Sequence, residues 1–131
     1  MKTFTSTIFA LALLGASAFG AAVPAAKADV SQPAKRDFYG DATYYYQYGV
    51  AGSCGEYHAD GDVIAALPPS QIGGSCGRTI RVSRAGYNDI YARVADTCPG
   101  CAYGSIDLST GAFDQIGNEA EGRIQVNWDF V

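Results

Sequence analysis

The sequence has little of what proteins that bind nucleic acids or membrane surfaces need. No lysine follows residue 36, and from there to the end twelve acidic residues face only five arginines. That part of the chain therefore carries a net charge of about −7 and would be repelled by phosphate backbones and anionic bilayers. We expect neither a nucleic acid nor a membrane as partner, and a neutral partner remains open.

Hydrophobic runs long enough to span a membrane are also missing. The most apolar segment lies at the N-terminus. The run Phe9–Leu14 is too short to span a bilayer. It follows the positive charge of Lys2 and precedes the small residues 16–18, which is the layout of a secretory signal. We predict a signal peptide over residues 1–20 and a secreted, extracellular protein.

The next segment lacks both periodicity and large apolar residues. Residues 21–36 are mostly Ala, Pro, Lys and Gln, a composition that cannot bury enough apolar surface to fold. The segment ends in Lys35 and Arg36, a basic pair that a secretory-pathway protease could reach and cut, although a chance pair in a linker is the alternative. We predict a pro-segment over 21–36 and one mature domain over 37–131.

Histidine is rarer still, since His58 is the only one. It lies in the polar run Glu56–Asp62, which predicts a surface loop, and a single histidine without partners is usually a solvated loop residue. The acids of this run lack the closing glutamate of a calcium loop. We predict no metal site and no cofactor.

Four cysteines, by contrast, lie within the predicted mature domain: Cys54, Cys76, Cys98 and Cys101. An even number in a short secreted chain indicates two disulfides, and each typically stabilises a fold by roughly 2–4 kcal/mol. The last two have the spacing of a redox or zinc motif, but a zinc site usually needs a second close pair. Structural disulfides are the favoured interpretation, and the spacing alone leaves their pairing open.

Frequent glycines limit the secondary-structure elements to short ones. Alternation of apolar and polar residues, or richness in Thr and Tyr, predicts strands. The predicted strands cover residues 41–47, 79–83, 90–95 and 124–130.

One segment has helical rather than strand features. Ser109 is a good N-cap, and Phe113 and Ile116 lie three residues apart, which predicts a short helix within residues 108–117. A second helical turn is predicted at residues 70–72, after two prolines. Together the patterns predict a mainly β domain of five or six strands with one or two short helices, closed into a barrel.

Tyrosines are concentrated in the first predicted strand. Alternation places Asp41, Thr43 and Tyr45 on one face of this strand and Tyr44 and Tyr46 on the other. Exposed tyrosine rings are suited to lie against sugar rings, whereas the alternative is that all of them pack in the core or at its rim.

Seven short motifs now form an ordered set along the chain. They are Ala42–Tyr45, Ser53–Gly55, Ser75–Gly77, Val94–Asp96, Ile106–Ser109, Ala112–Phe113 and Ile124–Trp128. In this order and spacing they resemble the double-psi β-barrel domain shared by expansins, barwin-like proteins, rare-lipoprotein-A-like proteins and the small fungal loosenins. The resemblance covers essentially the whole of residues 37–131 and implies a disulfide-stapled, six-stranded double-psi β-barrel with one or two short helices.

The resemblance also implies a binding groove and a disulfide pairing. In expansins a Thr and a Tyr of the first motif and an Asp of the Asp-Leu-Ser motif line a polysaccharide groove, and these match Thr43, Tyr45 and Asp107. We expect neighbouring backbone donors to hold the Asp107 carboxylate. A second family aspartate matches Asp96, but the aromatic residue two positions further on in bacterial expansins is Cys98 here. Barwin-like relatives imply a Cys54–Cys76 disulfide, which leaves Cys98 to Cys101.

The barrel resembles that of family-45 endoglucanases as well, which need one carboxyl as acid and one as base. Asp107 matches the acid, but Tyr46 and Gln47 stand where the base would be. Asp41 is the one nearby carboxylate on the Thr43 face and is therefore a further candidate for the groove. Tyr44 is another candidate, for its ring. Hydrolysis is not expected, although activity through Asp41 is not excluded.

Lytic transglycosylases of the rare-lipoprotein-A type carry a histidine after the first loop, and the comparable stretch Ile64–Leu67 has none. The resemblance therefore implies a secreted, monomeric protein that binds cell-wall polysaccharide (glucan, chitin-like or peptidoglycan) and loosens it without hydrolysis. Its cellulose affinity should be weaker than that of full expansins, since their carbohydrate-binding second domain has no counterpart in the sequence. The alternative is a protein-binding module, either a cysteine-protease inhibitor or a barwin-like defence or effector protein.

Overall fold

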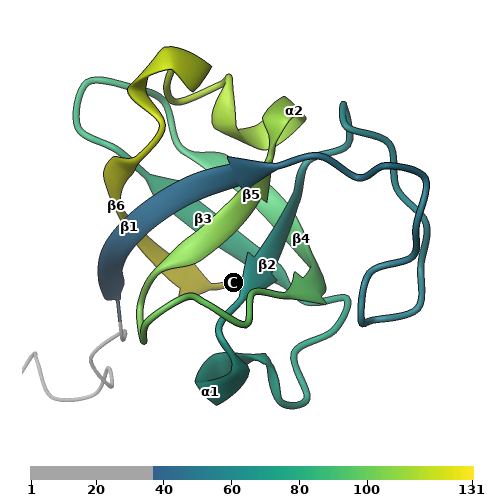
Figure 1. The fold of residues 1–131 in the computed structure, drawn as a ribbon. Helices are drawn as coiled ribbons and strands as arrows, with labels where there is room; N and C mark the ends of the chain where they lie inside the picture. Colours follow the sequence, from purple (N-terminus) through teal and green to yellow (C-terminus); the bar gives the residue numbers. More distant parts are fainter. Residues whose placement is uncertain (1–36) are drawn as a thin grey trace, which may run out of the picture. The chain divides into compact units, whose positions relative to one another are not determined.

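The computed structural model of the chain describes residues 37–131 (Figure 1). The predicted signal peptide and pro-segment concern residues 1–36 and lie outside the described residues. Within the described range, no helix is long and apolar enough to cross a membrane.

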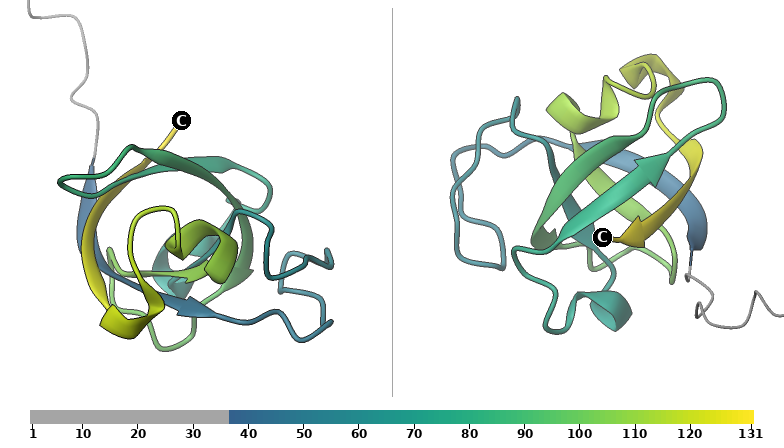
Figure 2. Two further views of the ribbon diagram at one scale, coloured as in Figure 1. Left: turned by 90° about the horizontal axis from the view of Figure 1, so that it is seen from above. Right: turned by 180° about the vertical axis from the view of Figure 1, so that it is seen from behind.

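Six strands form a closed barrel in the order β1-β5-β2-β4-β3-β6 (Figure 2). Their bounds are β1 Phe38–Tyr45, β2 Ile64–Leu67, β3 Thr79–Ser83, β4 Ile90–Thr97, β5 Ile106–Ser109 and β6 Ile124–Phe130. The pairs β1–β5 and β2–β4 are parallel and the other four are antiparallel. The predicted closed six-stranded barrel is therefore confirmed.

The strands that the sequence predicted best are those with a clean alternation. β3 and β6 have the predicted bounds, β4 continues two residues beyond its predicted end, and β1 runs over 38–45 rather than 41–47. β2 and β5 were missed as strands. Each has four residues, nearly all of them buried, so neither shows an alternation that a sequence pattern could reveal.

Two short helices lie at the ends of the barrel. α1 (Pro69–Ile72) confirms the predicted turn after the prolines. α2 (Thr110–Phe113) begins after Ser109 as predicted but ends well before residue 117. Its end comes early because the next amides, of Gln115 and Ile116, bond to carbonyls only three residues back. A 3₁₀ turn, η2 (Glu119–Glu121), follows and was not predicted.

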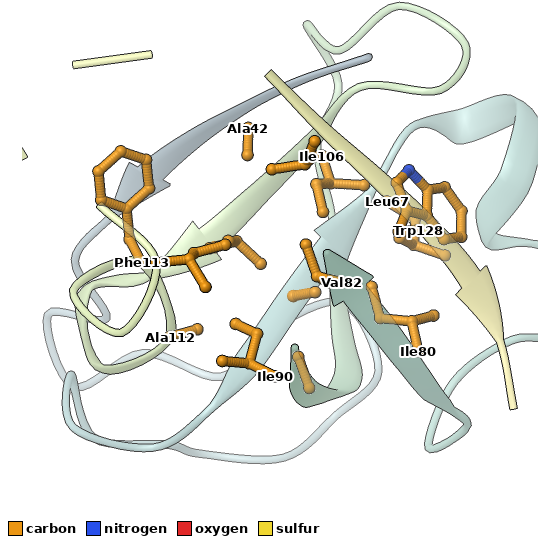
Figure 3. Close-up of a cluster of buried hydrophobic side chains, with 14 of the residues drawn as sticks. Ala42, Leu67, Ile80, Val82, Ile90, Ile106, Ala112, Phe113 and Trp128 are labelled. Atoms are coloured by element: carbon orange, nitrogen blue, oxygen red, sulfur yellow. The ribbon is translucent and has the colours of Figure 1, made fainter. Parts of the chain in front are cut away.

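The barrel interior is filled by side chains from all six strands (Figure 3). Trp128 of β6 is the largest of them, and its indole Nε1 donates to the carbonyl of Gly104 at 2.8 Å. α2 lies over one opening of the barrel and buries Ala112 and Phe113 there (Figure 2). Because the interior is filled, a ligand would have to bind to the outer face of the strands or to the loops.

Ser109 ties α2 to the start of β2. Its hydroxyl accepts from the amides of Ala112 and Ile64, each at 3.2 Å, and donates to the carbonyl of Asp62. These contacts use the full capacity of a hydroxyl group.

Ser109→Ala is expected to lower the free energy of unfolding by about 1–2 kcal/mol, because two buried amides lose their acceptor. For a domain of this size the melting temperature should fall by roughly 5–10 °C, measured by circular dichroism. The matched control is Ser70→Ala, at an exposed position of α1. Equal melting temperatures for the two variants would contradict the role of Ser109.

The cysteines are paired as the resemblance implied, Cys54 with Cys76 and Cys98 with Cys101. The first bond joins the long β1–β2 loop to the segment before β3, and the second closes the turn after β4. No free cysteine is present among residues 37–131.

Candidate functional site

Four residues stand in register across four adjacent strands of the barrel. Thr43 of β1 pairs with Asp107 of β5, Asp107 with Ala66 of β2, and Ala66 with Asp96 of β4. Because the neighbours of Thr43 and Asp107 along their strands belong to the core, these two side chains point outward. We call Thr43, Asp107, Ala66 and Asp96 the polar row. Its third member, Ala66, is buried and carries no polar group.

Asp96 reaches this face only because of a β-bulge. The register between β2 and β4 shifts between Ala65 and Ala66, which pair with Val94 and Asp96. Val94 is fully buried in the core, and without the bulge Asp96, two residues later, would face inward as well. The bulge therefore turns a charged side chain out of the barrel and into the polar row.

Asp107 sits half-buried at the centre of the site. Its Oδ1 accepts a hydrogen bond from the Thr43 hydroxyl at 2.9 Å. Burial raises the pKa of Asp107, the Thr43 hydrogen bond partly offsets this, and the nearby Asp96 charge raises it further. This carboxyl holds a proton more readily than a surface aspartate.

Backbone donors hold Asp96 rather than Asp107, contrary to the expectation from the sequence. Asp96 Oδ1 accepts from the amides of Ser53 at 2.7 Å and Thr97 at 2.8 Å. Its Oδ2 lies 3.5 Å from the hydroxyl of Tyr45. Burial, and then the charge of Asp96, raises the pKa of Tyr45, so its hydroxyl remains a hydrogen-bond donor. The Asp107 carboxylate is held by a side chain because it lies within β5, whose backbone amides are used by the barrel.

Asp41 shares the outward face of β1 with Thr43, as predicted, but it is engaged by partners that the sequence did not reveal. Its carboxylate accepts from Arg123 Nη1 at 2.7 Å and from the amide of Gln125. Asp41, Thr43 and Arg123 border a hollow whose other wall is the Cys98–Cys101 turn.

The structure separates Tyr44 from the other candidates. Its ring lies against the core, 4.9 Å from the Phe113 ring, and its hydroxyl donates to the carbonyl of Glu119. Tyr46 lies on the same side, with its ring 6.1 Å from Tyr44. The predicted alternation of faces therefore holds, and it places Tyr44 opposite the polar row.

His58 differs from its prediction as a solvated residue without partners. Its side chain is only 15% exposed and lies between two acids, with Nε2 3.3 Å from Glu56 and Nδ1 3.3 Å from Asp62. Glu56 also accepts two hydrogen bonds from Arg93. In the part of the chain that the structure describes, no group of three His, Cys, Asp or Glu side chains is arranged to hold a metal ion.

The barrel and its site define a class of protein. A family model of the double-psi β-barrel, described as "Lytic transglycolase", matches residues 37–128. The chain belongs to this family, which confirms the predicted double-psi barrel of the expansin-like and rare-lipoprotein-A-like kind.

Individual relatives agree with this assignment. An "EG45-like domain containing protein" of Citrus jambhiri is 30% identical over 103 residues, which cover 69% of this chain and 79% of that protein. A mutant of Clavibacter michiganensis expansin, solved in complex with cellohexaose, superposes with a TM-score of 0.67 at 25% identity. The match covers 73% of this chain and 50% of the expansin, so this chain spans half the length of that protein. The Streptomyces papain inhibitor superposes with a TM-score of 0.65 at 28% identity, over 73% of this chain and 94% of the inhibitor.

Proposed function

We propose that this protein is secreted, binds a neutral cell-wall polysaccharide across the polar row, and loosens it without cleaving it. The observation that carries the proposal is the alignment of Thr43, Asp107 and Asp96 on one outward face. Neighbouring strands lie about 4.8 Å apart, so the row offers donors and acceptors at spacings that successive sugar hydroxyls can meet. The similar expansin bound to cellohexaose and the two disulfides support the proposal.

Loosening follows from competition for hydrogen bonds. A hydrogen bond to a charged group contributes about 1.5–3 kcal/mol, compared with about 0.5–1.5 kcal/mol for one between neutral groups. A glucan hydroxyl that bonds to a carboxylate of the row therefore gains more than it does with a neighbouring chain. The acidic surface favours a neutral polymer over an anionic one.

Cleavage is not expected, because the carboxylates near Asp107 have other partners. An inverting hydrolase needs a second carboxyl roughly 6.5–9.5 Å from the first, free to take a proton from water. Asp41 is bound by Arg123 and Gln125, and Asp96 by two backbone amides. These donors hold both carboxylates in place, so neither is free to turn toward a water molecule opposite Asp107.

The test uses protein purified after the full chain is expressed in a secreting host. We expect retention on at least one of cellulose, chitin and peptidoglycan in pull-down assays, with no release of reducing sugar above the blank. Sugar release that grows with protein concentration and disappears in Asp107→Asn would overturn the non-hydrolytic assignment. Failure to bind any of the three polymers would overturn the proposal as a whole.

A second candidate function is protease inhibition, which the match to nearly the whole Streptomyces papain inhibitor favours. An inhibitor would depend on a loop such as residues 56–62 and not on Asp107. Inhibition of papain that survives Asp107→Asn, together with absent polymer binding, would select this function.

A further inference from the structure

The loop between β1 and β2, residues 46–63, carries a shallow hollow outside the polar row. This loop projects from the barrel as a separate lobe (Figure 1). The residues that border the hollow come from both arms of the loop: Gln47, Tyr48 and Gly49 from the outgoing arm, and Tyr57, His58, Ala59 and Asp60 from the returning arm. We call it the tyrosine hollow.

The two arms are fixed to each other, so the hollow exists without a ligand. The amide of Gln47 donates to Asp60 Oδ1 at 2.6 Å, and a β-bridge joins Ala51 to Tyr57. The Cys54–Cys76 disulfide anchors the tip of the loop to the segment before β3. A preformed site of this kind loses little conformational entropy on binding.

Two tyrosine rings at the hollow are directed to solvent. Tyr48 is 83% exposed and Tyr57 is 73% exposed. Tyr48 is also the one non-glycine residue among the described ones with a positive φ, at 50°. A bulky side chain in this left-handed region is uncommon and strained, and an exposed ring recovers nothing by core burial. The Tyr48 ring lies beside that of Tyr46, with centroids 5.9 Å apart, and most of the Tyr48 and Tyr57 rings remains available to a ligand.

A buried polar group borders the same hollow. Gln47 is only 6% exposed, and its amide nitrogen makes no hydrogen bond of normal geometry. As a donor near the Tyr45 hydroxyl it lowers the pKa of that group, against the larger effect of burial. The nitrogen is itself shielded from solvent, so it faces Tyr45 rather than a ligand in the hollow. Since Tyr45 also approaches Asp96, Gln47 connects the tyrosine hollow to the polar row.

We propose that the tyrosine hollow binds one further sugar ring of the polysaccharide chain that lies across the polar row, which rests on the function proposed above. Tyr48 and Tyr57 contact the apolar face of the ring. A neutral sugar fits this place better than an anion, because the acids Glu56, Asp60 and Asp62 lie close by.

The experiment measures affinity as a function of ligand length. Cello-oligosaccharides and N-acetylchito-oligosaccharides of two to six units are titrated by calorimetry into the protein secreted from the full chain. For the sugar series that binds, we expect the affinity to rise roughly fivefold or more once the chain is long enough to reach the hollow. Tyr57→Ala and Tyr48→Asn should lose this rise and leave the affinity for short ligands unchanged; asparagine tolerates the positive φ at position 48.

Tyr91→Ala is the matched control, since Tyr91 is 58% exposed on β4, far along the strand from Asp96. It should keep the rise in affinity. The same variants are also compared for retention on the polymers, so that weak oligosaccharide binding does not decide the result.

Failure of this inference is distinguishable from failure of the proposed function. If the wild type binds sugar but both hollow variants keep the full dependence on length, the hollow is not a sugar site and the polar row stands alone. If the wild type binds no oligosaccharide and no polymer, both proposals fall. If Tyr57→Ala abolishes papain inhibition with sugar binding unchanged, the occupant is a polypeptide and the inference is overturned.

Discussion

Asp107→Asn is expected to weaken polysaccharide binding at least about tenfold, with the melting temperature at neutral pH unchanged or slightly higher. The variant keeps the shape of the side chain and an oxygen that can accept from Thr43, but it removes the charge. A ligand hydroxyl then loses about 1.4 kcal/mol, the difference between a hydrogen bond to a charged and to a neutral acceptor, which corresponds to tenfold. Binding to the retained polymer and thermal unfolding are measured on the same preparation.

The pH dependence of stability follows from the raised pKa of Asp107. The folded state holds this proton more tightly than the unfolded state, so ionisation of Asp107 costs stability above the folded-state pKa. The cost is absent below the pKa of the unfolded chain, where both states are protonated. The Asp107→Asn variant has no such cost at any pH, because its amide does not ionise. The difference in melting temperature, variant minus wild type, should therefore be largest near neutral pH. It should approach zero in acid.

The control for charge alone is Asp114→Asn, an exposed position just after α2. It should bind as the wild type does. If Asp107→Asn instead melts several degrees lower and its folded fraction binds normally, Asp107 is a structural residue and the site assignment fails.

Gly40→Ala is expected to destabilise the barrel by at least about 3 kcal/mol, at the upper end of what overpacking costs. A Cβ at this position would lie 2.4 Å from the carbonyl oxygen of Gly104 and 2.7 Å from the amide of Ser105. Both are backbone atoms, so no side-chain rotation relieves the overlap. The melting temperature should fall by at least about 12 °C in thermal unfolding followed by circular dichroism.

Gly73→Ala is the matched control for this substitution. Its φ of −51° suits any residue, and a Cβ there would meet nothing within 4 Å. Its stability should stay within about 0.5 kcal/mol of the wild type. Similar melting temperatures for the two variants would contradict the prediction and would show that the backbone at residues 40 and 104 can move apart at little cost in stability.

The sequence predicted those parts of the molecule whose cause is local. β3 and β6 alternate cleanly, and Ser109 starts α2 through its own hydroxyl. The family resemblance predicted the cysteine pairing and the candidates Thr43, Asp107 and Asp96 of the polar row. Local sequence patterns predict neither.

What the sequence did not predict depends on contacts between distant residues. Asp41 and Arg123 are 82 positions apart, and no pattern in either segment indicates that they meet. Asp96 faces outward because of a bulge, and the break in the alternation of β4 at Val94 and Ala95 looks like a strand end in the sequence alone. The sequence predicts a solvated His58 because its partners, Glu56 and Asp62, are recognisable only once the loop is folded.

The pairing of β1 with strands from the end of the chain determines when the barrel can form. β1 contacts β5 across 64 positions, at Thr43 and Asp107, and β6 across 84, at Asp41 and Gln125. Such distant pairings make folding slow, since a long loop must close before any contact compensates for its entropy. During synthesis the barrel therefore cannot close before β6 has been made. Until β6 pairs with both β1 and β3, the edges of these two strands remain unpaired and can pair with other chains.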